Sequence, residues 1–132
     1  VGGDHVRVAG IGFRGAAELS SLRDALQLAL DAAGGGTLDA LVTESAKSRD
    51  IVFRALAAEM GLPGLGVSQT DMAQMITPTQ SARIQDRFGT GSLAEAAALA
   101  LAGPGATLAA CRVVSGDGMA TAAIAETTGG DA

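Results

Sequence analysis

The sequence predicts an α/β fold: a three-layer sandwich in which a mixed, mostly parallel sheet carries helices on both faces and includes a C-terminal antiparallel hairpin. Three observations support this prediction. Short apolar runs typical of buried strands alternate with segments whose leucines and alanines recur at helical spacing. Glycines and prolines mark the ends of these segments. Two apolar runs near the C-terminus flank Ser115-Gly116-Asp117-Gly118, which is typical of a hairpin turn.

The first half of the chain alternates strands with helices. A β-branched run at 6–11 leads into a glycine-rich loop at 10–15 and an amphipathic helix at 19–33, which three glycines end. A buried strand at 38–42, a loop at 43–47 and a helix at 51–60 follow. A strand, a helix and a second strand in this order predict a parallel pair with a right-handed crossover.

The second half contains one more clear helix and the hairpin. A short strand at 65–67 precedes a polar stretch at 68–85, with a helical run near 71–75, which fits either an ordered binding loop or a mobile lid. Ser92 and Glu95 have the spacing of a capping box at the start of an alanine-rich helix that ends at residue 102. Strands at 107–114 and 119–125 form the hairpin. We expect residues 1–132 to form a single domain, with its core at about 6–125 and a flexible tail at 126–132.

Composition disfavours several classes of function. A net charge of −5 and the absence of Trp and Tyr argue against nucleic-acid binding, because phosphates are repelled and no stacking platform is available. No apolar run is long enough to span a membrane and no export signal opens the chain, so we expect a cytoplasmic protein without a membrane partner. One histidine and one cysteine, Cys111, support neither a metal site nor a catalytic triad. Cys111 lies in an apolar run and should fill core volume, and we expect no metal or other cofactor.

The segment from Gly10 to Gly15 has the pattern Gly-x-Gly-x-x-Gly, in which glycines let backbone amides approach an anion. A dinucleotide site is one interpretation, since Glu44 stands where such a site has its acidic residue. The C-terminal hairpin argues against it, because it replaces the second nucleotide-binding half of that fold. A tight turn without any ligand also explains the glycines.

Two cations follow neighbouring strands. Because the carboxyl ends of parallel strands meet at one edge of a sheet, Arg14 and Lys47 should face the same space. The helix that begins after Gly91 and Ser92 adds backbone amides if it packs at the same edge. Such a site suits a ligand with several carboxylates or phosphates. Glu95 is explained by the cap, although a carboxylate at a ligand-facing helix start could also transfer protons.

Four segments, read in order, resemble the cobalamin biosynthesis family that comprises CobE and the C-terminal domain of CbiG. They span about 6–125 and are Gly10-Ile11-Gly12-Phe13-Arg14-Gly15, Thr43-Glu44-Ser45-Ala46-Lys47 with Asp50, the run from Gly91 to Leu99, and Thr121-Ala122-Ala123-Ile124-Ala125. Family members usually carry Gly-x-Gly-Cys-Arg-Arg-Gly, so Phe13 replaces the cysteine and one arginine is absent. A mechanism that depends on that thiol is therefore excluded. Asp50 stands where Glu is more usual, and Arg112 keeps the charge of a family lysine.

The resemblance implies a role in corrin-ring construction. CbiG is similar in this region and acts as a cobalt-precorrin hydrolase that opens a lactone and releases acetaldehyde, whereas CobE is a stand-alone protein of the aerobic route. The expected ligand is a precorrin or hydrogenobyrinic-type tetrapyrrole. Its carboxylates would be bound by residues of the three loops, namely Gly10, Gly12, Phe13, Arg14, Gly15, Thr43, Lys47, Gly91 and Ser92.

The resemblance leaves the chemistry open. Glu95 and Asp50 are the candidates for proton transfer if the protein is an enzyme related to the hydrolase. The alternative is a non-catalytic partner or carrier for another enzyme of the cobalamin pathway. A homodimer through a free strand edge is a further expectation.

Overall fold

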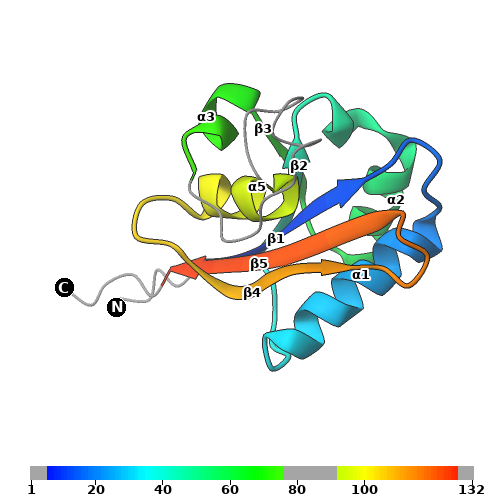
Figure 1. The fold of residues 1–132 in the computed structure, drawn as a ribbon, viewed down its shortest axis with the longest axis horizontal. Helices are drawn as coiled ribbons and strands as arrows, with labels where there is room; N and C mark the ends of the chain where they lie inside the picture. The colour runs from blue at the N-terminus through cyan, green and yellow to red at the C-terminus, as the bar shows by residue number, and fades with distance from the viewer. Residues whose placement is uncertain (1–5, 76–91, 128–132) are drawn as a thin grey trace.

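The computed structural model describes residues 6–75 and 92–127. Five strands in this part of the chain form one sheet in the order β3-β2-β1-β5-β4. They are β1 (Val6–Phe13), β2 (Ala40–Glu44), β3 (Gly64–Val67), β4 (Thr107–Val114) and β5 (Ala120–Thr127). β1 pairs in parallel with β2 and β2 with β3, while β5 runs antiparallel to both β1 and β4 (Figure 1). The predicted mixed sheet and C-terminal hairpin are confirmed.

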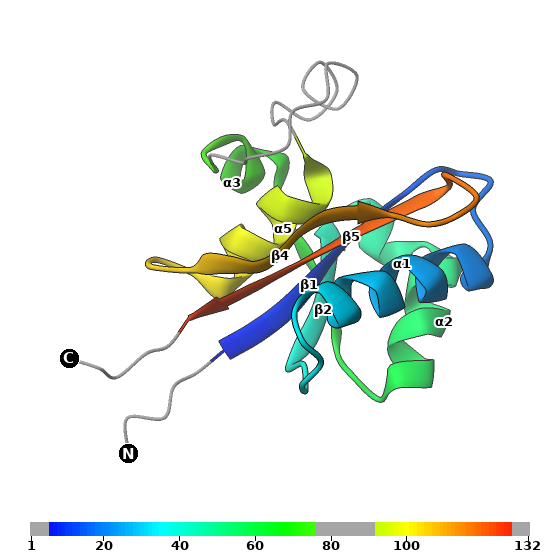
Figure 2. The ribbon, with the colours of Figure 1, turned by 60° about the horizontal axis from the view of Figure 1, so that its bottom comes forward.

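Helices cover both faces of the sheet. α1 (Leu19–Ala32) and α2 (Ile51–Met60) lie on one face, and α3 (Gln69–Ala73) and α5 (Leu93–Ala102) lie on the other (Figure 2). Leu22, Leu26 and Phe53 fill the core on the first face, whereas the core on the α5 face consists mainly of alanine and valine. The three layers agree with the predicted sandwich. Within the described residues, no helix combines the length and the apolar character needed to cross a membrane.

Side-chain caps begin α2 and α5; the sequence predicted the cap at Ser92, whereas Asp50 was predicted only as a candidate for proton transfer. The Oδ1 atom of Asp50 accepts a hydrogen bond from the backbone N of Val52 at 3.0 Å and starts α2. The Oγ atom of Ser92 accepts one from the backbone N of Glu95 at 3.3 Å and starts α5. Gly61 ends α2 with a φ of 68°, which glycine adopts without strain.

The glycine-rich segment is mostly strand, so the prediction of a loop at 10–15 was wrong for its first residues. Gly10, Gly12 and Phe13 all belong to β1, and the loop begins at Arg14. A Cβ atom on Gly10 would lie 2.0 Å from the backbone oxygen of Ala94 in α5. A Cβ atom on Gly12 would lie 2.6 Å from the Oγ1 atom of Thr121. Gly10 is therefore required for the close approach of α5, which leaves a ligand no room there, whereas the nearest atom at Gly12 belongs to a side chain of β5.

Cys111 is exposed, contrary to the prediction that its thiol fills core volume. It lies on β4, an edge strand whose register with β5 shifts between Leu108 and Ala110 and again between Ala110 and Val113. Such bulges break the alternation of inward and outward side chains, which an apolar run does not reveal. On the other side of the hairpin, β5 extends to Thr127, two residues beyond the expected end. Residues 128–132 of the expected tail lie outside the described residues.

Candidate functional site

The ends of β1 and β2 meet at Lys47. This residue opens a short 3-10 helix, η1 (Lys47–Arg49), shortly after β2. Its Nζ atom donates a hydrogen bond of 2.8 Å to the carbonyl oxygen of Phe13, the last residue of β1. The same Nζ atom lies 4.6 Å from the centroid of the Phe13 ring, within the range of a cation–π contact. The structure therefore brings the loop after β2 against the start of the loop after β1.

Lys47 is also the only lysine of the chain, since the other eight basic residues are arginines. An ammonium group differs from a guanidinium because it is a compact point charge on a flexible stem. The presence of a single lysine is visible in the sequence alone and is a signal that could have distinguished Lys47 from the arginines. It gives Lys47 a chemistry that no other side chain of the protein supplies.

Glu44 holds the loop that carries Lys47. Its Oε2 atom accepts a hydrogen bond from the backbone N of Ala46 at 3.0 Å, and its Oε1 atom accepts one from the backbone N of Lys47 at 3.3 Å. The dinucleotide interpretation requires this carboxylate to bind a ribose and the glycines of β1 to approach a pyrophosphate. Because the carboxylate bonds its own loop and Gly10 lies under α5, both requirements are contradicted.

Arg14 directly follows Phe13, the residue that Lys47 contacts. It is exposed, and its backbone N donates a hydrogen bond of 3.0 Å to the carbonyl oxygen of Met119. Its guanidinium makes no ion pair with any of the described residues. Gly15 beside it is exposed, and a Cβ atom there would meet nothing within 4 Å. An anion could thus reach Arg14 from solvent, one residue from the carbonyl group that holds Lys47.

Thr43 is fully buried, and its Oγ1 atom has no hydrogen-bond partner among the described residues. It pairs in register with Gly66 of β3, so the two positions face the same side of the sheet. A Cβ atom on Gly66 would lie 2.9 Å from the Cα atom of Ser45 and 2.9 Å from the Oγ atom of Ser48. The unpaired hydroxyl therefore lies on the side of the sheet covered by the segment that carries Lys47.

The start of α5 lies on the other face of the sheet. A Cβ atom on Gly12 would be 3.6 Å from the Cδ2 atom of Leu93, so the first turn of α5 covers Gly12. The ring of Phe13, by contrast, packs with the core of the α1 and α2 face. Ser92 is buried and caps its helix. Gly91, the remaining predicted residue of this loop, lies outside the described residues.

Both candidates for proton transfer make structural contacts. The side chain of Glu95 is fully buried, and its Oε2 atom accepts a hydrogen bond of 2.8 Å from the backbone N of Arg112 in β4. The predicted cap by Ser92 is present. The hydrogen bond from the backbone N of Arg112 shows that the Glu95 carboxylate contacts β4. Asp50 caps α2 through its carboxylate.

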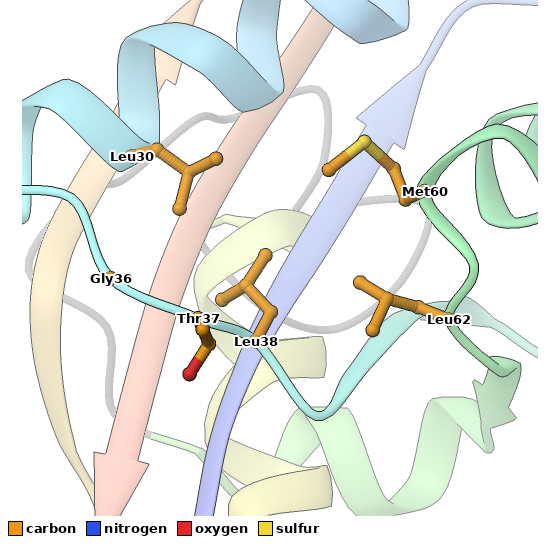
Figure 3. Close-up of a pocket in the computed structure, with 6 residues that line it drawn as sticks. All are labelled: Leu30, Gly36, Thr37, Leu38, Met60 and Leu62. Atoms are coloured by element: carbon orange, nitrogen blue, oxygen red, sulfur yellow. The ribbon is translucent and has the colours of Figure 1, made fainter.

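A cavity of about 220 Å³ lies at the opposite, amino edge of the sheet. Its walls are Leu30, Gly36, Thr37, Leu38, Met60 and Leu62, and the four large apolar side chains turn toward one another (Figure 3). No charged residue lines it, so it does not suit a ligand with many carboxylates. In the part of the chain that the structure describes, no three side chains of His, Cys, Asp or Glu gather as metal ligands.

Comparisons with known proteins identify a family model and similar solved structures. The family model described as "Cobalamin synthesis G C-terminus" matches residues 7–125. The crystal structure of CobE, a protein from the cobalamin biosynthetic pathway, is similar with a TM-score of 0.87 and 28% identity, over 98% of this chain and 96% of that chain. Cobalamin biosynthesis protein chiG from Agrobacterium tumefaciens is similar with a TM-score of 0.72 and 37% identity, over 93% of this chain and 99% of that chain.

A third solved structure shares the fold alone. It is a putative cobalamin biosynthesis protein G homolog from Sulfolobus solfataricus, with a TM-score of 0.68 and 17% identity. The match covers 95% of this chain and 38% of the homolog. No curated protein sequence matches the chain.

Proposed function

The chain belongs to the cobalamin synthesis G C-terminus family, and from that premise we propose that it serves cobalamin biosynthesis by binding a tetrapyrrole intermediate through the carboxylates of the ligand. The proposed ligand is a precorrin or a hydrogenobyrinic-type corrinoid. Arg14 and Lys47 are its proposed anchors. The proposal includes a cytoplasmic location, for which the support is the sequence alone.

The hydrogen bond of 2.8 Å between the Nζ atom of Lys47 and the carbonyl oxygen of Phe13 is the observation that carries this proposal. It holds an ammonium group beside the residue that precedes Arg14. Arg14 follows Phe13 directly in the chain, so the two cations come from neighbouring loops at the carboxyl edge of the sheet, where ligands of open α/β sheets bind. The acetate and propionate groups around a corrin ring are charges that such a pair would bind.

The negative net charge of the protein makes affinity for a polycarboxylate depend on these two cations. A net charge of −5 repels a polycarboxylate at long range, so affinity depends on local positive groups. The buried hydroxyl of Thr43 is a further proposed contact, because an unpaired hydroxyl in the interior is unfavourable until it finds a partner. A ligand oxygen or a water molecule held by the ligand would supply one.

Binding is proposed here rather than hydrolysis. The Glu95 carboxylate is fully buried against β4, and the Asp50 carboxylate caps α2, so each is occupied in holding the fold together. A general acid or base must come within hydrogen-bond reach of the reacting atoms. The same observation favours the carrier or partner role over an independent enzyme.

Titration with hydrogenobyrinic acid, followed by the absorbance of its chromophore, tests the proposal. Lys47→Met and Arg14→Met should each weaken binding about tenfold, since each removes a charged hydrogen-bond donor. Arg49→Met is the matched control, because it removes the same charge from an exposed position two residues away and should leave affinity unchanged. Cobinamide, whose side chains are amides, should bind more weakly than the acid. Equal affinity of all variants would contradict the anchors.

The same titration separates binding from turnover. A spectrum that shifts on mixing and then stays constant supports a binding protein. A spectrum that continues to change with time at a catalytic concentration of protein would show conversion of the intermediate, and would contradict the binding role proposed here.

A further inference from the structure

We propose that Phe13 positions the ammonium group of Lys47 for carboxylate capture, and that it does so with its ring as well as with its carbonyl oxygen. The inference rests on the proposed function for the nature of the ligand. Its first test needs no ligand. Phe13 acts through Lys47, and so it is a positioning residue.

Two restraints from one residue act on the same nitrogen. The carbonyl oxygen of Phe13 accepts a hydrogen bond from Nζ at 2.8 Å, and the ring centroid lies 4.6 Å from Nζ. A lysine side chain has a long flexible stem and many rotamers, whose entropy is lost when a ligand fixes it. Restraints from the carbonyl and from the ring face reduce that freedom before the ligand arrives, which favours binding by preorganisation.

The Phe13 ring packs among several residues of the α1 and α2 core, of which Phe53 is one. Phe13 is 8% exposed, and its ring stacks on the ring of Phe53, with centroids 6.5 Å apart and planes at 7°. Phe53 belongs to α2 and is fully buried. A continuous series of contacts therefore runs from the α2 core through the Phe13 ring to the ammonium group of Lys47. The chain has three Phe and no Tyr or Trp, so two of its three large aromatic rings lie in this series.

The single lysine makes the proposal measurable. Acetylation with limiting acetic anhydride, followed by mass spectrometry of the peptide that contains Lys47, reports one side-chain amine and no other. Phe13→Leu keeps the carbonyl oxygen and most of the apolar volume but removes the ring under the ammonium group. Without the ring, the amine loses one of its two contacts with Phe13 and becomes more accessible to the reagent. We expect Lys47 to react about two to five times faster in this variant.

Two further variants distinguish positioning from damage to the core. Phe53→Leu makes the same change one step deeper in the stack. It leaves the Phe13 ring, which the other residues of the α1 and α2 core still hold, so Lys47 should react at a rate close to that of the wild type. Phe13→Trp restores an aromatic face and should return the rate toward that of the wild type. An unchanged rate in Phe13→Leu, or an equal increase in Phe53→Leu, would overturn the proposal.

Affinity for hydrogenobyrinic acid supplies the second readout. Phe13→Leu should bind this acid about two to five times more weakly, and Phe53→Leu should bind it as the wild type does. If Lys47→Met weakens binding while Phe13→Leu does not, the anchor is real and the positioning role is refuted. If Lys47→Met binds as the wild type does, the proposed function fails at this anchor. The acetylation rates still decide whether Phe13 holds the ammonium group.

Discussion

The two ends of strand β1 carry the same residue type in opposite circumstances. Arg7, near the amino end, is buried, and its guanidinium donates hydrogen bonds to the carbonyl oxygens of Gly35 at 2.7 Å and Ala33 at 3.3 Å. It also pairs with the carboxylate of Glu126 at 3.3 Å. Arg14, just past the carboxyl end, is exposed and forms no ion pair with the described residues.

The difference separates a structural cation from one available to a ligand. The Arg7 guanidinium donates hydrogen bonds to carbonyl groups at and just beyond the C-terminal end of α1, where a positive charge is favourable. Its donors are used within the fold. Arg14 is exposed to solvent, forms no ion pair with the described residues, and directly follows Phe13, the residue that Lys47 contacts. The amino half of β1 therefore serves stability, and its carboxyl end is open to function.

The largest difference should be that between alanine substitutions at Gly10, in the middle of β1, and at Gly15, in the loop after it. Gly10→Ala would place a Cβ atom 2.0 Å from the Ala94 backbone oxygen, so α5 must move, and we expect a loss of about 3 kcal/mol or more in the free energy of unfolding. Gly15→Ala enters open space and should be neutral within about 0.5 kcal/mol. Urea denaturation measures both. Similar losses in the two variants would show that the carboxyl end is as tightly packed as the centre of the strand.

The two arginines should differ by somewhat less. Arg7→Met leaves several buried carbonyl groups and part of the Glu126 charge without a partner, and should cost about 2 kcal/mol. Arg14→Met should change stability by less than about 0.5 kcal/mol while it weakens binding of hydrogenobyrinic acid. The measurements are urea denaturation and the absorbance titration on the same samples. A large loss of stability in Arg14→Met would place this residue in the structural class with Arg7.

Thr43 offers a smaller and opposite effect. Thr43→Val replaces a buried, unpaired hydroxyl with a methyl group of similar size, so it should raise the free energy of unfolding by about 1 kcal/mol. The same change should weaken binding of hydrogenobyrinic acid if that hydroxyl meets the ligand. Thermal denaturation with and without ligand measures both effects. A loss of stability in the free protein would show that the hydroxyl already has a partner in solution.

Much of this architecture follows from local patterns in the sequence. The bounds of α2 and α5 agree with the prediction because Asp50, Ser92 and Gly61 are strong local signals for helix ends. Lys47 and the end of β1 converge as expected because both follow parallel strands. Gly10 and Cys111 were misjudged for another reason. The close approach of α5 and the bulges of β4 depend on packing between distant segments, which a local pattern does not contain.

The contact between Lys47 and Phe13 also depends on packing that a local sequence pattern does not contain. The sequence placed both residues at the edge, yet the fact that one holds the other depends on the path of η1 over the end of β1. Glu44 was considered only as the acidic residue of the dinucleotide interpretation, which the C-terminal hairpin already argued against. Its carboxylate instead bonds two amides only two and three residues away, a local turn that could have been anticipated.

The smallest effect concerns the hairpin turn beside Arg14. Hydrogen bonds to the Asp117 carboxylate from the hydroxyl of Ser115, the hydroxyl of Ser21 and the backbone N of Met119 lower its pKa from 3.8 to about 2. Because the folded state favours the ionised form, this stabilisation is complete above about pH 4 and is lost as the pH falls through about 2. Solvent screening keeps the effect modest, since Asp117 is exposed.

Asp117→Asn should therefore be less stable than the wild type by a constant amount from pH 7 to pH 5, and the difference should shrink between pH 4 and pH 2. Urea denaturation across this range measures the difference, and Ser21→Ala, which removes one of the donors, should show a smaller version of the same profile. A difference that stays constant down to pH 2.5 would mean that the carboxylate is not held ionised by these donors. The hydrogen bonds to Asp117 would then stabilise this turn little. Because the carbonyl oxygen of Met119 in the turn accepts a hydrogen bond from the backbone N of Arg14, the Arg7 end of β1 would be the more strongly stabilised of the two ends in its loops as well as in its side chains.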